Sequence, residues 1–582
     1  MKRRDFFITL TIIVGALLLR VVAAVQLASG AAAVYNPSPA TDMATYWELS
    51  GKIIHGDYSG VFYYQPFYYA VWLPALRLVW NSINMVIAAQ TVIGVLVVLL
   101  TMSTGKMIGG RVTGWIAGVL CAVCTPLLLY TPFLIIANVQ TLWVALIAWL
   151  GVRLIKRGGG LNYWLLSFTL GAAILTRGNA WYVFPIVVLL FFRIWGWRRA
   201  AAASGCTLLV ILLIQLPFIW HNTVELGRLS GPSTAAGQVM ALGNTPEAPP
   251  GGRDFNTSAG PMEYPDSWQR WMAEAGTRTV FSQILDWARR EPAAFAELQF
   301  RKLLMFWDWR DIPNNVALFG EGAVSYVGSL FFVPGIIIAF ALAELLSKLR
   351  RAAARRRGDW FFILLLIVGY WFSTAAFYNL SRFRAPVFPL LAVFAGLFVV
   401  TAARRFVLCR RGFYLTAVPA LLTGVFITFA GYDFYSEHCE KTMMRLVRPD
   451  GVRDGDTIRD NGPFSFGGWR ELKVRPGDRI VKRLAVPSET GGVATLNVAP
   501  SDRRRLPLSV ELPNGKIYSG IEKVTFPVSD RGNIEFKVVG NPGNSALVID
   551  LHRDYGRTEV NGRPAAGELV MSATAAEQPD SL

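Results

Sequence analysis

The sequence predicts a polytopic α-helical membrane protein followed by an external β-sandwich domain. Of its 582 residues, 53% are hydrophobic and only 16% are charged, which is too apolar for a soluble enzyme of this length. Apolar runs near twenty residues recur as far as Tyr432. Beyond Tyr432, short alternating runs are separated by Pro-Gly, Asn-Gly and Gly-Asn turns. The chain therefore divides into a membrane domain (1–432) and a β-domain (433–582).

Each apolar run can cross a hydrocarbon core of about 30 Å as a helix. About eleven spans are expected, and the fifth is short. They cover residues 6–28, 84–107, 112–130, 133–155, 161–176, 180–197, 201–220, 323–346, 360–379, 383–403 and 413–432.

Lysine and arginine collect at every second junction between these spans. The positive-inside rule places those junctions, and the N-terminus, in the cytoplasm, with the β-domain outside. The first span has a basic start, but its apolar run is long and we expect it to remain as an anchor. A formal net charge of +18 does not indicate nucleic-acid binding, because the cations lie in short clusters between spans.

The first external loop (29–83) holds the early carboxylate Asp42 and many aromatic residues. Tyr46, Leu49 and Ile53 recur at helical spacing, which predicts a short amphipathic helix at the membrane interface. Asp42 is either the N-cap of this helix or a functional group. A second interfacial helix, or the lead into the next span, is expected at 63–80.

The second long external loop (221–322) begins with a stretch rich in Gly, Pro, Ser and Thr. Between residues 278 and 306, spaced apolar residues predict two helices broken at Pro292. In the β-domain, strands are expected at 472–474, 479–486, 493–498, 506–512, 524–528, 533–539 and 546–552, with a disordered tail from Thr574. Carbohydrate binding and a structural or docking role both remain open for this domain.

Arginines stand near the external ends of several spans. Arg20 lies in the outer part of the first span, Arg177 follows the fifth, and Arg382 and Arg384 open the tenth. Each can anchor to lipid headgroups or bind a phosphate. Acidic residues are nearly absent from the spans, which counts against a proton-coupled transporter.

Five external stretches occur in a set order. They are Asp42 with the following aromatics and YQPFY at 64–68, LTRGNA at 175–180, LGNTPEA at 242–248, FWDWRDIPNN at 306–315, and RFRAPVFP at 382–389. Over residues 1–432 this pattern resembles the GT-C membrane glycosyltransferases. It is most similar to the bacterial branch related to protein O-mannosyltransferases and the lipid A aminoarabinose transferase.

The resemblance implies an inverting glycosyltransferase that moves a sugar from a polyprenyl-phosphate donor to an acceptor hydroxyl. The reaction would occur on the periplasmic face of a bacterial inner membrane. Asp42 would be the catalytic base. Arg382 and Arg384, then Arg177 and Arg20, would bind the donor phosphate. Residues expected around the site or at the acceptor are Glu48, His55, Tyr64, Asn244, Asp308, Arg310 and Asp311.

Two departures from the family pattern bear on metal binding. Met43 and Ala44 follow Asp42 where some members carry a second acid, and Asn138 and Gln140 stand where many have Glu. A metal-independent reaction without a cofactor is therefore favoured, and a metal held by distant loops is the alternative. His55 adds no ligand set, because no partner lies at ligand spacing.

The expected partners are a polyprenyl-phosphate sugar, an acceptor that is a lipid, glycan or protein, and the bilayer, with no nucleic acid. The sequence does not identify the sugar, the acceptor or the oligomeric state. A transporter or flippase for a lipid-linked sugar is the alternative function. A non-catalytic membrane scaffold for the β-domain is the second alternative.

Overall fold

The structure is a computed structural model of the chain. It describes all residues except 1–2, 40, 247, 249, 252–265, 275–278, 315, 317–321, 353–358, 448–451, 455–456, 460–468, 485–490, 500–505, 529–532, 551–556 and 576–582. The chain forms two compact units. The first is built mainly from Met1–Ala236 and Leu303–Gly431, and the second includes Gly237–Phe255, Met262–Lys302 and Tyr432–Leu582.

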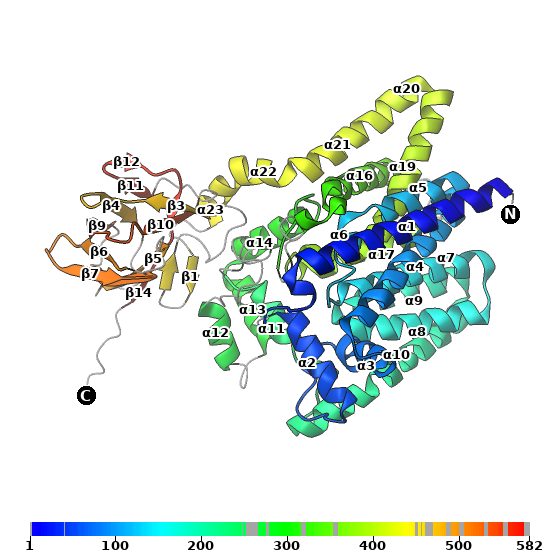
Figure 1. The fold of residues 1–582 in the computed structure, drawn as a ribbon. Coiled ribbons are helices and arrows are strands. Elements are labelled where there is room, and N and C mark those ends of the chain that lie inside the picture. The colour runs from blue at the N-terminus through cyan, green and yellow to red at the C-terminus, as the bar shows by residue number, and fades with distance from the viewer. Residues whose placement is uncertain are drawn as a thin grey trace. The chain divides into compact units, whose positions relative to one another are not determined.

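The first unit is helical throughout (Figure 1). Up to residue 226 its elements are α1 (Arg3–Gly30), η1 (Ala32–Val34), α2 (Asp42–Ile54), η2 (Phe67–Trp72), α3 (Leu73–Val79), α4 (Ile83–Gly109), α5 (Arg111–Ala122), α6 (Thr125–Leu129), α7 (Ala137–Arg157), α8 (Gly160–Thr176), η3 (Gly178–Tyr182), α9 (Val183–Ile194) and α10 (Trp197–Leu226). The rest are η5 (Gly322–Val324), η6 (Tyr326–Leu330), α16 (Val333–Ala352), α17 (Trp360–Ala375), α18 (Ser381–Arg384), η7 (Ala385–Val387), α19 (Phe388–Leu408), α20 (Arg410–Gly412), η8 (Phe413–Ala417) and α21 (Val418–Phe429).

Among the described residues, seven helices are long and apolar enough to cross a membrane. Four other expected spans are apolar helices of fewer than eighteen residues: Arg111–Ala122, Gly160–Thr176, Gly178–Ile194 and Trp360–Ala375. A multi-pass membrane protein is therefore confirmed. The predicted interfacial helix at Asp42 is α2, and the second is η2 with α3.

Two predicted boundaries are wrong. The third span is not one helix over 112–130, because α5 ends at Ala122 and α6 begins at Thr125. Pro126 explains the break, since proline has no N–H for the helical ladder and disfavours helix in the residue before it. The long loop begins later than His221, because α10 continues to Leu226 and ends against Gly227, whose φ of 62° favours glycine.

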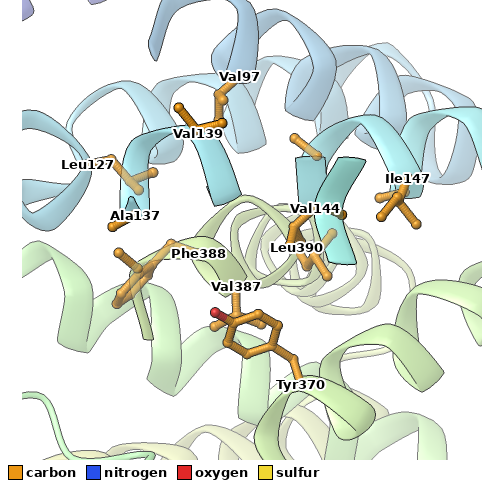
Figure 2. Packing of buried hydrophobic residues seen from close by; sticks show 14 of the residues in the cluster. Val97, Leu127, Ala137, Val139, Val144, Ile147, Tyr370, Val387, Phe388 and Leu390 are labelled. Carbon is orange, nitrogen blue, oxygen red and sulfur yellow. The ribbon is translucent and has the colours of Figure 1, made fainter. Parts of the chain in front are cut away.

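The core of the first unit is one hydrophobic cluster that joins distant parts of the chain. Figure 2 shows Val139 and Val144 of α7 in this cluster with Val387 of η7 and Leu390 of α19. Tyr370 of α17 lies beside Val387. The turn from α18 to α19 is thus fixed by apolar packing on α7, and this turn carries the site described below.

Ion pairs link the junctions predicted to be cytoplasmic. Asp5 near the N-terminus pairs with Arg111, the first residue of α5, at 2.7 Å. Lys156 at the end of α7 pairs with Asp359, just before α17, at 2.8 Å. Each pair brings two predicted cytoplasmic junctions together, as expected when alternate junctions share one side of a membrane.

The second unit contains the helices of the long loop and the β-domain. Its helices are α11 (Ala236–Leu242), α12 (Asp266–Ala273), α13 (Val280–Arg290), α14 (Pro292–Met305), α22 (Gly431–Tyr435), η9 (Ser436–Glu440) and α23 (Lys441–Val447). The two helices predicted in the loop are α13 and α14, and the break lies at Pro292 as expected. Trp287 and Leu298 are buried together between them.

The β-domain has two antiparallel sheets around one core. The first sheet contains β1 (Val452–Asp454), β2 (Thr457–Arg459), β3 (Trp469–Lys473), β5 (Gly492–Ala499), β8 (Lys523–Val528), β10 (Ala546–Asp550), β13 (Glu568–Leu569) and β14 (Met571–Ala575). The second runs β12 (Arg563–Pro564), β11 (Thr558–Val560), β4 (Arg479–Arg483), β9 (Asn533–Gly540), β6 (Leu508–Glu511) and β7 (Ile517–Gly520).

All seven predicted strands of the β-domain are present, at β3, β4, β5, β6, β8, β9 and β10. The tail predicted from Thr574 is corrected at its start, because Thr574 and Ala575 end β14 by pairing with β5. Residues 576–582 of that tail lie outside the described residues. Lys482 of β4 and Glu568 of β13 form a buried ion pair between the two sheets.

Arg20 is fully buried within α1, which packs against α4 and α5 (Figure 1). Its Nη1 donates to the carbonyl of Ala16, and Nε and Nη2 have no hydrogen-bond partner among the described residues. Gly94 of α4 makes room for it, because a Cβ there would lie 2.0 Å from the Arg20 Nε.

We expect Gly94→Ala to destabilise the protein, because the added methyl group must displace a buried guanidinium. Overpacking of this kind costs about 1–3 kcal/mol. Thermal unfolding in detergent measures the loss, and Gly15→Ala is the control, since a Cβ at Gly15 meets nothing within 4 Å. An unchanged melting temperature for Gly94→Ala would contradict this packing.

Candidate active site

Asp42 and Arg382, 340 residues apart, form an ion pair in the first unit. Asp42 is the first residue of α2, and Thr41 occupies the N-cap position that was the alternative role for Asp42. Arg382 is the second residue of α18, and its Nη1 donates to the Asp42 Oδ2 at 2.6 Å. The two side chains are 25% and 16% exposed, so water screens the pair only in part.

Arg177 joins this pair through the ring of Phe383. Its guanidinium carbon lies 3.6 Å from the ring centroid, and that of Arg382 lies 5.2 Å from the same centroid. In the described part of the chain, no hydrogen bond or ion pair engages the Arg177 side chain, whereas its backbone N–H donates to the carbonyl of Ala173. The pKa of Arg177 is lowered, chiefly by burial and also by the charge of Arg382. The cluster thus contains one carboxylate and two guanidinium groups. Its net charge is positive, and this charge favours the binding of an anion.

Tyrosines hold α2 in place beside the ion pair. Tyr46 lies one turn after Asp42 and is 4% exposed. Its ring centroid is 5.5 Å from that of Tyr64 and 5.4 Å from that of Tyr68, both edge to face, and it stacks on Tyr69 at 6.1 Å. Burial raises the pKa of Tyr46 well above its usual value, and the negative charge of Asp42 raises it further. Tyr46 therefore stays neutral.

Arg384 points to a different set of partners from Arg382. Its Nη1 donates to the carbonyl of Asp308 and, at 3.3 Å, to that of Phe306, while Nη2 donates to the carbonyl of Arg310 at 2.5 Å. These bonds fix the FWDWRD segment against α18. Asp308 in turn accepts hydrogen bonds from the backbone N–H of Arg310 at 2.8 Å and from its Nε at 2.9 Å.

Arg382 also lines a narrow cavity that is too small to hold a water molecule. Tyr130, Ile135, Ile312 and Val316 form most of its wall. The cavity is therefore apolar apart from the guanidinium, the Tyr130 hydroxyl and Asn314.

The other predicted residues are more scattered. Tyr64 contacts Tyr46, as described. Glu48 and His55 are exposed on α2 and its end, where Glu48 pairs with Lys52 at 3.4 Å and His55 binds the carbonyl of Gly51. Asn244 belongs to the second unit and accepts hydrogen bonds from Gln299 and Lys302. Arg20 is enclosed by helices and lines neither of the two cavities described for the first unit.

Sequence reasoning missed the parts played by Phe383 and Tyr46. The sequence did contain a signal for Phe383, because this residue stands between two arginines that were predicted to bind phosphate. The sequence also contained a signal for Tyr46, because it follows Asp42 by four positions on a predicted helix.

Among the described residues, no group of three or more His, Cys, Asp or Glu side chains is placed to hold a metal ion.

No family model and no curated protein matches this chain. Three solved structures of glycosyl-transferring proteins are similar to it. The oligosaccharyltransferase of Archaeoglobus fulgidus in the apo form is 15% identical over 76% of this chain and 58% of its own, with a TM-score of 0.41. This chain thus spans less than two thirds of that protein.

ArnT from Cupriavidus metallidurans, solved with undecaprenyl phosphate, is 16% identical over 75% of this chain and 72% of its own, with a TM-score of 0.38. Arabinosyltransferase EmbB from Mycobacterium smegmatis is 13% identical over 95% of this chain and 64% of its own, with a TM-score of 0.27.

We expect burial of Tyr46 to weaken the fold at alkaline pH. A raised pKa means that the unfolded chain releases this proton before the folded chain does, so stability is full below the usual value near 10 and falls above it. Between pH 9 and 11, the melting temperature of Tyr46→Phe should therefore decline less than that of the wild type. Parallel declines would show that Tyr46 ionises freely in the folded protein.

Proposed function

We propose that this chain is a GT-C-type glycosyltransferase that moves a sugar from a polyprenyl-phosphate donor to an acceptor hydroxyl, with inversion at the anomeric carbon. The observation that carries the proposal is the Asp42–Arg382 ion pair with Arg177 beside it, because the Arg177 side chain forms no ion pair with any described residue. A carboxylate and adjacent cations are what this reaction needs, because one group must accept a proton while another receives a departing phosphate.

Asp42 is the base in this proposal. The acceptor oxygen attacks the anomeric carbon, its proton passes to the Asp42 carboxylate, and the bond between that carbon and the phosphate oxygen breaks. The phosphate leaves with the bonding electrons. Arg382 lies close enough to the carboxylate to bridge it to the leaving phosphate.

Arg382 and Arg177 bind that phosphate. A guanidinium presents a planar fork of donors that matches phosphate oxygens, and partial burial strengthens each contact. Arg384 instead acts as a positioning residue, because both of its Nη atoms already bind backbone carbonyls of the FWDWRD segment.

The site would lie on the external face of a bacterial inner membrane, with the N-terminus in the cytoplasm. The pairs Asp5–Arg111 and Lys156–Asp359 support this topology, because each joins two basic junctions of the kind kept in the cytoplasm. The sugar acceptor is a lipid, a glycan or a protein hydroxyl.

We expect Asp42→Asn to lower transfer by about 100-fold to 10,000-fold, the range contributed by general base catalysis. The assay uses purified protein, radiolabelled undecaprenyl-phosphate sugars and a panel of acceptors. The control is Asp57→Asn, an exposed acid in the same loop that binds Ser59. Equal turnover of Asp42→Asn and wild type would remove Asp42 from the mechanism.

We expect Arg177→Gln to weaken binding of undecaprenyl phosphate by about 10-fold to 100-fold, since hydrogen bonds to charged groups contribute about 1.5–3 kcal/mol. Binding is measured by the shift in melting temperature across a lipid titration. Arg228→Gln, which changes an exposed arginine just after α10, is the matched control. If both variants bind like wild type, Arg177 is not a phosphate ligand.

A further inference from the structure

Two amide side chains in the first unit, those of Gln90 in α4 and Asn138 in α7, hydrogen-bond to each other. We propose that they are positioning residues, which together hold Asp42 and Arg382 in place for the proposed transfer. Their catalytic role rests on the function proposed above, whereas their effect on the ion pair can be measured without it. Gln90 is 1% exposed, and Asn138 is half-buried.

Gln90 and Asn138 satisfy the backbone of a buried turn between α6 and α7. Gln90 Nε2 donates to the carbonyl of Thr131 at 2.9 Å and to that of Phe133 at 3.0 Å. Asn138 Nδ2 donates to the carbonyl of Tyr130 at 2.8 Å. Non-helical carbonyls inside a membrane domain need such donors, because a buried carbonyl without a partner is costly. The two amides therefore fix the shape of this turn.

The oxygen of the Gln90 amide connects the turn to the acid. Because backbone carbonyls only accept hydrogen bonds, the Gln90 nitrogen must face the turn, and Oε1 is left to serve other donors. Oε1 accepts from Asn138 Nδ2 at 3.1 Å and from the Tyr68 hydroxyl at 3.3 Å. The Tyr68 ring packs edge to face on Tyr46 with centroids 5.4 Å apart, and Tyr46 lies one turn after Asp42. Gln90 thus helps to fix the helix that carries the acid.

The buried turn also borders the cationic side of the ion pair. Tyr130 and Ile135, near its two ends, line the narrow cavity together with Arg382. Tyr130, Thr131 and Phe133 are at most 3% exposed, so the turn is enclosed by other side chains. Closely packed interiors transmit displacements. A shift of the turn would therefore move the wall against which the Arg382 side chain lies.

An amide is needed at both positions, because each side chain must donate. A carboxylate only accepts, so Asn138→Asp would place an oxygen against the Gln90 Oε1 and the carbonyl of Tyr130. Gln90→Glu would do the same at the carbonyls of Thr131 and Phe133. Both changes keep the size and shape of the side chain and alter only its hydrogen bonds and charge.

Cross-linking between positions 42 and 382 of the full chain in nanodiscs tests the proposal. Asp42→Cys and Arg382→Cys are combined with Cys206→Ser, Cys409→Ser and Cys439→Ser, which removes the natural cysteines that are not buried. A short methanethiosulfonate linker bridges the two introduced thiols, and mass spectrometry of the bridged peptides gives the rate. This rate reports the placement of α2 against α18 and requires no sugar transfer.

We expect Asn138→Asp and Gln90→Glu each to lower the rate of bridging about fivefold or more, the effect of one lost hydrogen bond. Where Asn138→Asp does not fold, Asn138→Ala removes the same donors without adding a charge and should lower the rate similarly. The matched control is Asn84→Asp, because Asn84 Oδ1 accepts from the Tyr35 hydroxyl and a carboxylate can still accept. Unchanged bridging in either folded variant, or an equal loss in Asn84→Asp, would overturn the proposal.

Transfer measurements separate positioning from a loss of folded protein. With Asp42 and Arg382 in place, Asn138→Asp should lower kcat per undecaprenyl-phosphate binding site by about 10-fold to 100-fold, because a misplacement near 1 Å can cost about 100-fold. The number of binding sites should equal that of the wild type. A purely structural role would instead reduce the number of sites and leave kcat per site unchanged, which would contradict the proposal.

Asp42→Asn distinguishes failure of this proposal from failure of the proposed reaction. If bridging falls in Asn138→Asp but Asp42→Asn retains transfer, the two amides position the ion pair and the catalytic assignment of Asp42 fails. If Asp42→Asn abolishes transfer but bridging and kcat of Asn138→Asp match those of the wild type, the positioning proposal fails alone.

Discussion

The ion pair between Asp42 and Arg382 is the constraint on which the site depends. It joins the first residue of α2 to the short helix α18. Two segments that are 340 residues apart in the sequence must therefore lie within hydrogen-bond distance of each other. An exposed pair of this kind contributes little stability, but partial burial reduces the screening by water. The packing of Tyr46 on three other tyrosines holds α2 in the required position.

The four residues of α18 separate two chemical environments. Arg382 reaches the cluster with excess positive charge, whereas Ser381 and Arg384 line a second narrow cavity, in which two carboxylates balance two guanidinium groups. Arg384 contributes by holding the carbonyls of the FWDWRD segment, and so it fixes the wall between the two environments. Arg382 and Arg384 belong to one motif but have different roles, because different positions of a helix face different directions.

Periodicity in the sequence predicted most of the helices and the longer strands, because burial of one face leaves a repeat of 3.6 or 2 residues. It did not predict β1, β2, β7, β11, β12, β13 or β14, and all of these except β14 have only two to four residues, too few to show alternation. It joined α5 and α6 into one span, because both are apolar and hydropathy alone hides the break at Pro126. For the site, motif order identified Asp42, Arg177 and Arg382 as candidates. It did not distinguish the role of Arg384 from that of Arg382. The partners of Arg384 are backbone carbonyls, which every residue has, so residue types do not predict these hydrogen bonds.

By itself, the sequence determined that the chain crosses a membrane many times, that it continues into a sheet domain, and that the loops predicted to be external carry one early acid and several arginines. These properties follow from composition and from spacing within single elements. Only the tertiary structure decided which arginine meets the acid, that Phe383 links Arg177 to Arg382, and that Arg20 is enclosed beside Gly94. The physical reason is that spacing sets the direction of a side chain relative to its own helix, whereas contact across 340 residues depends on how the helices pack.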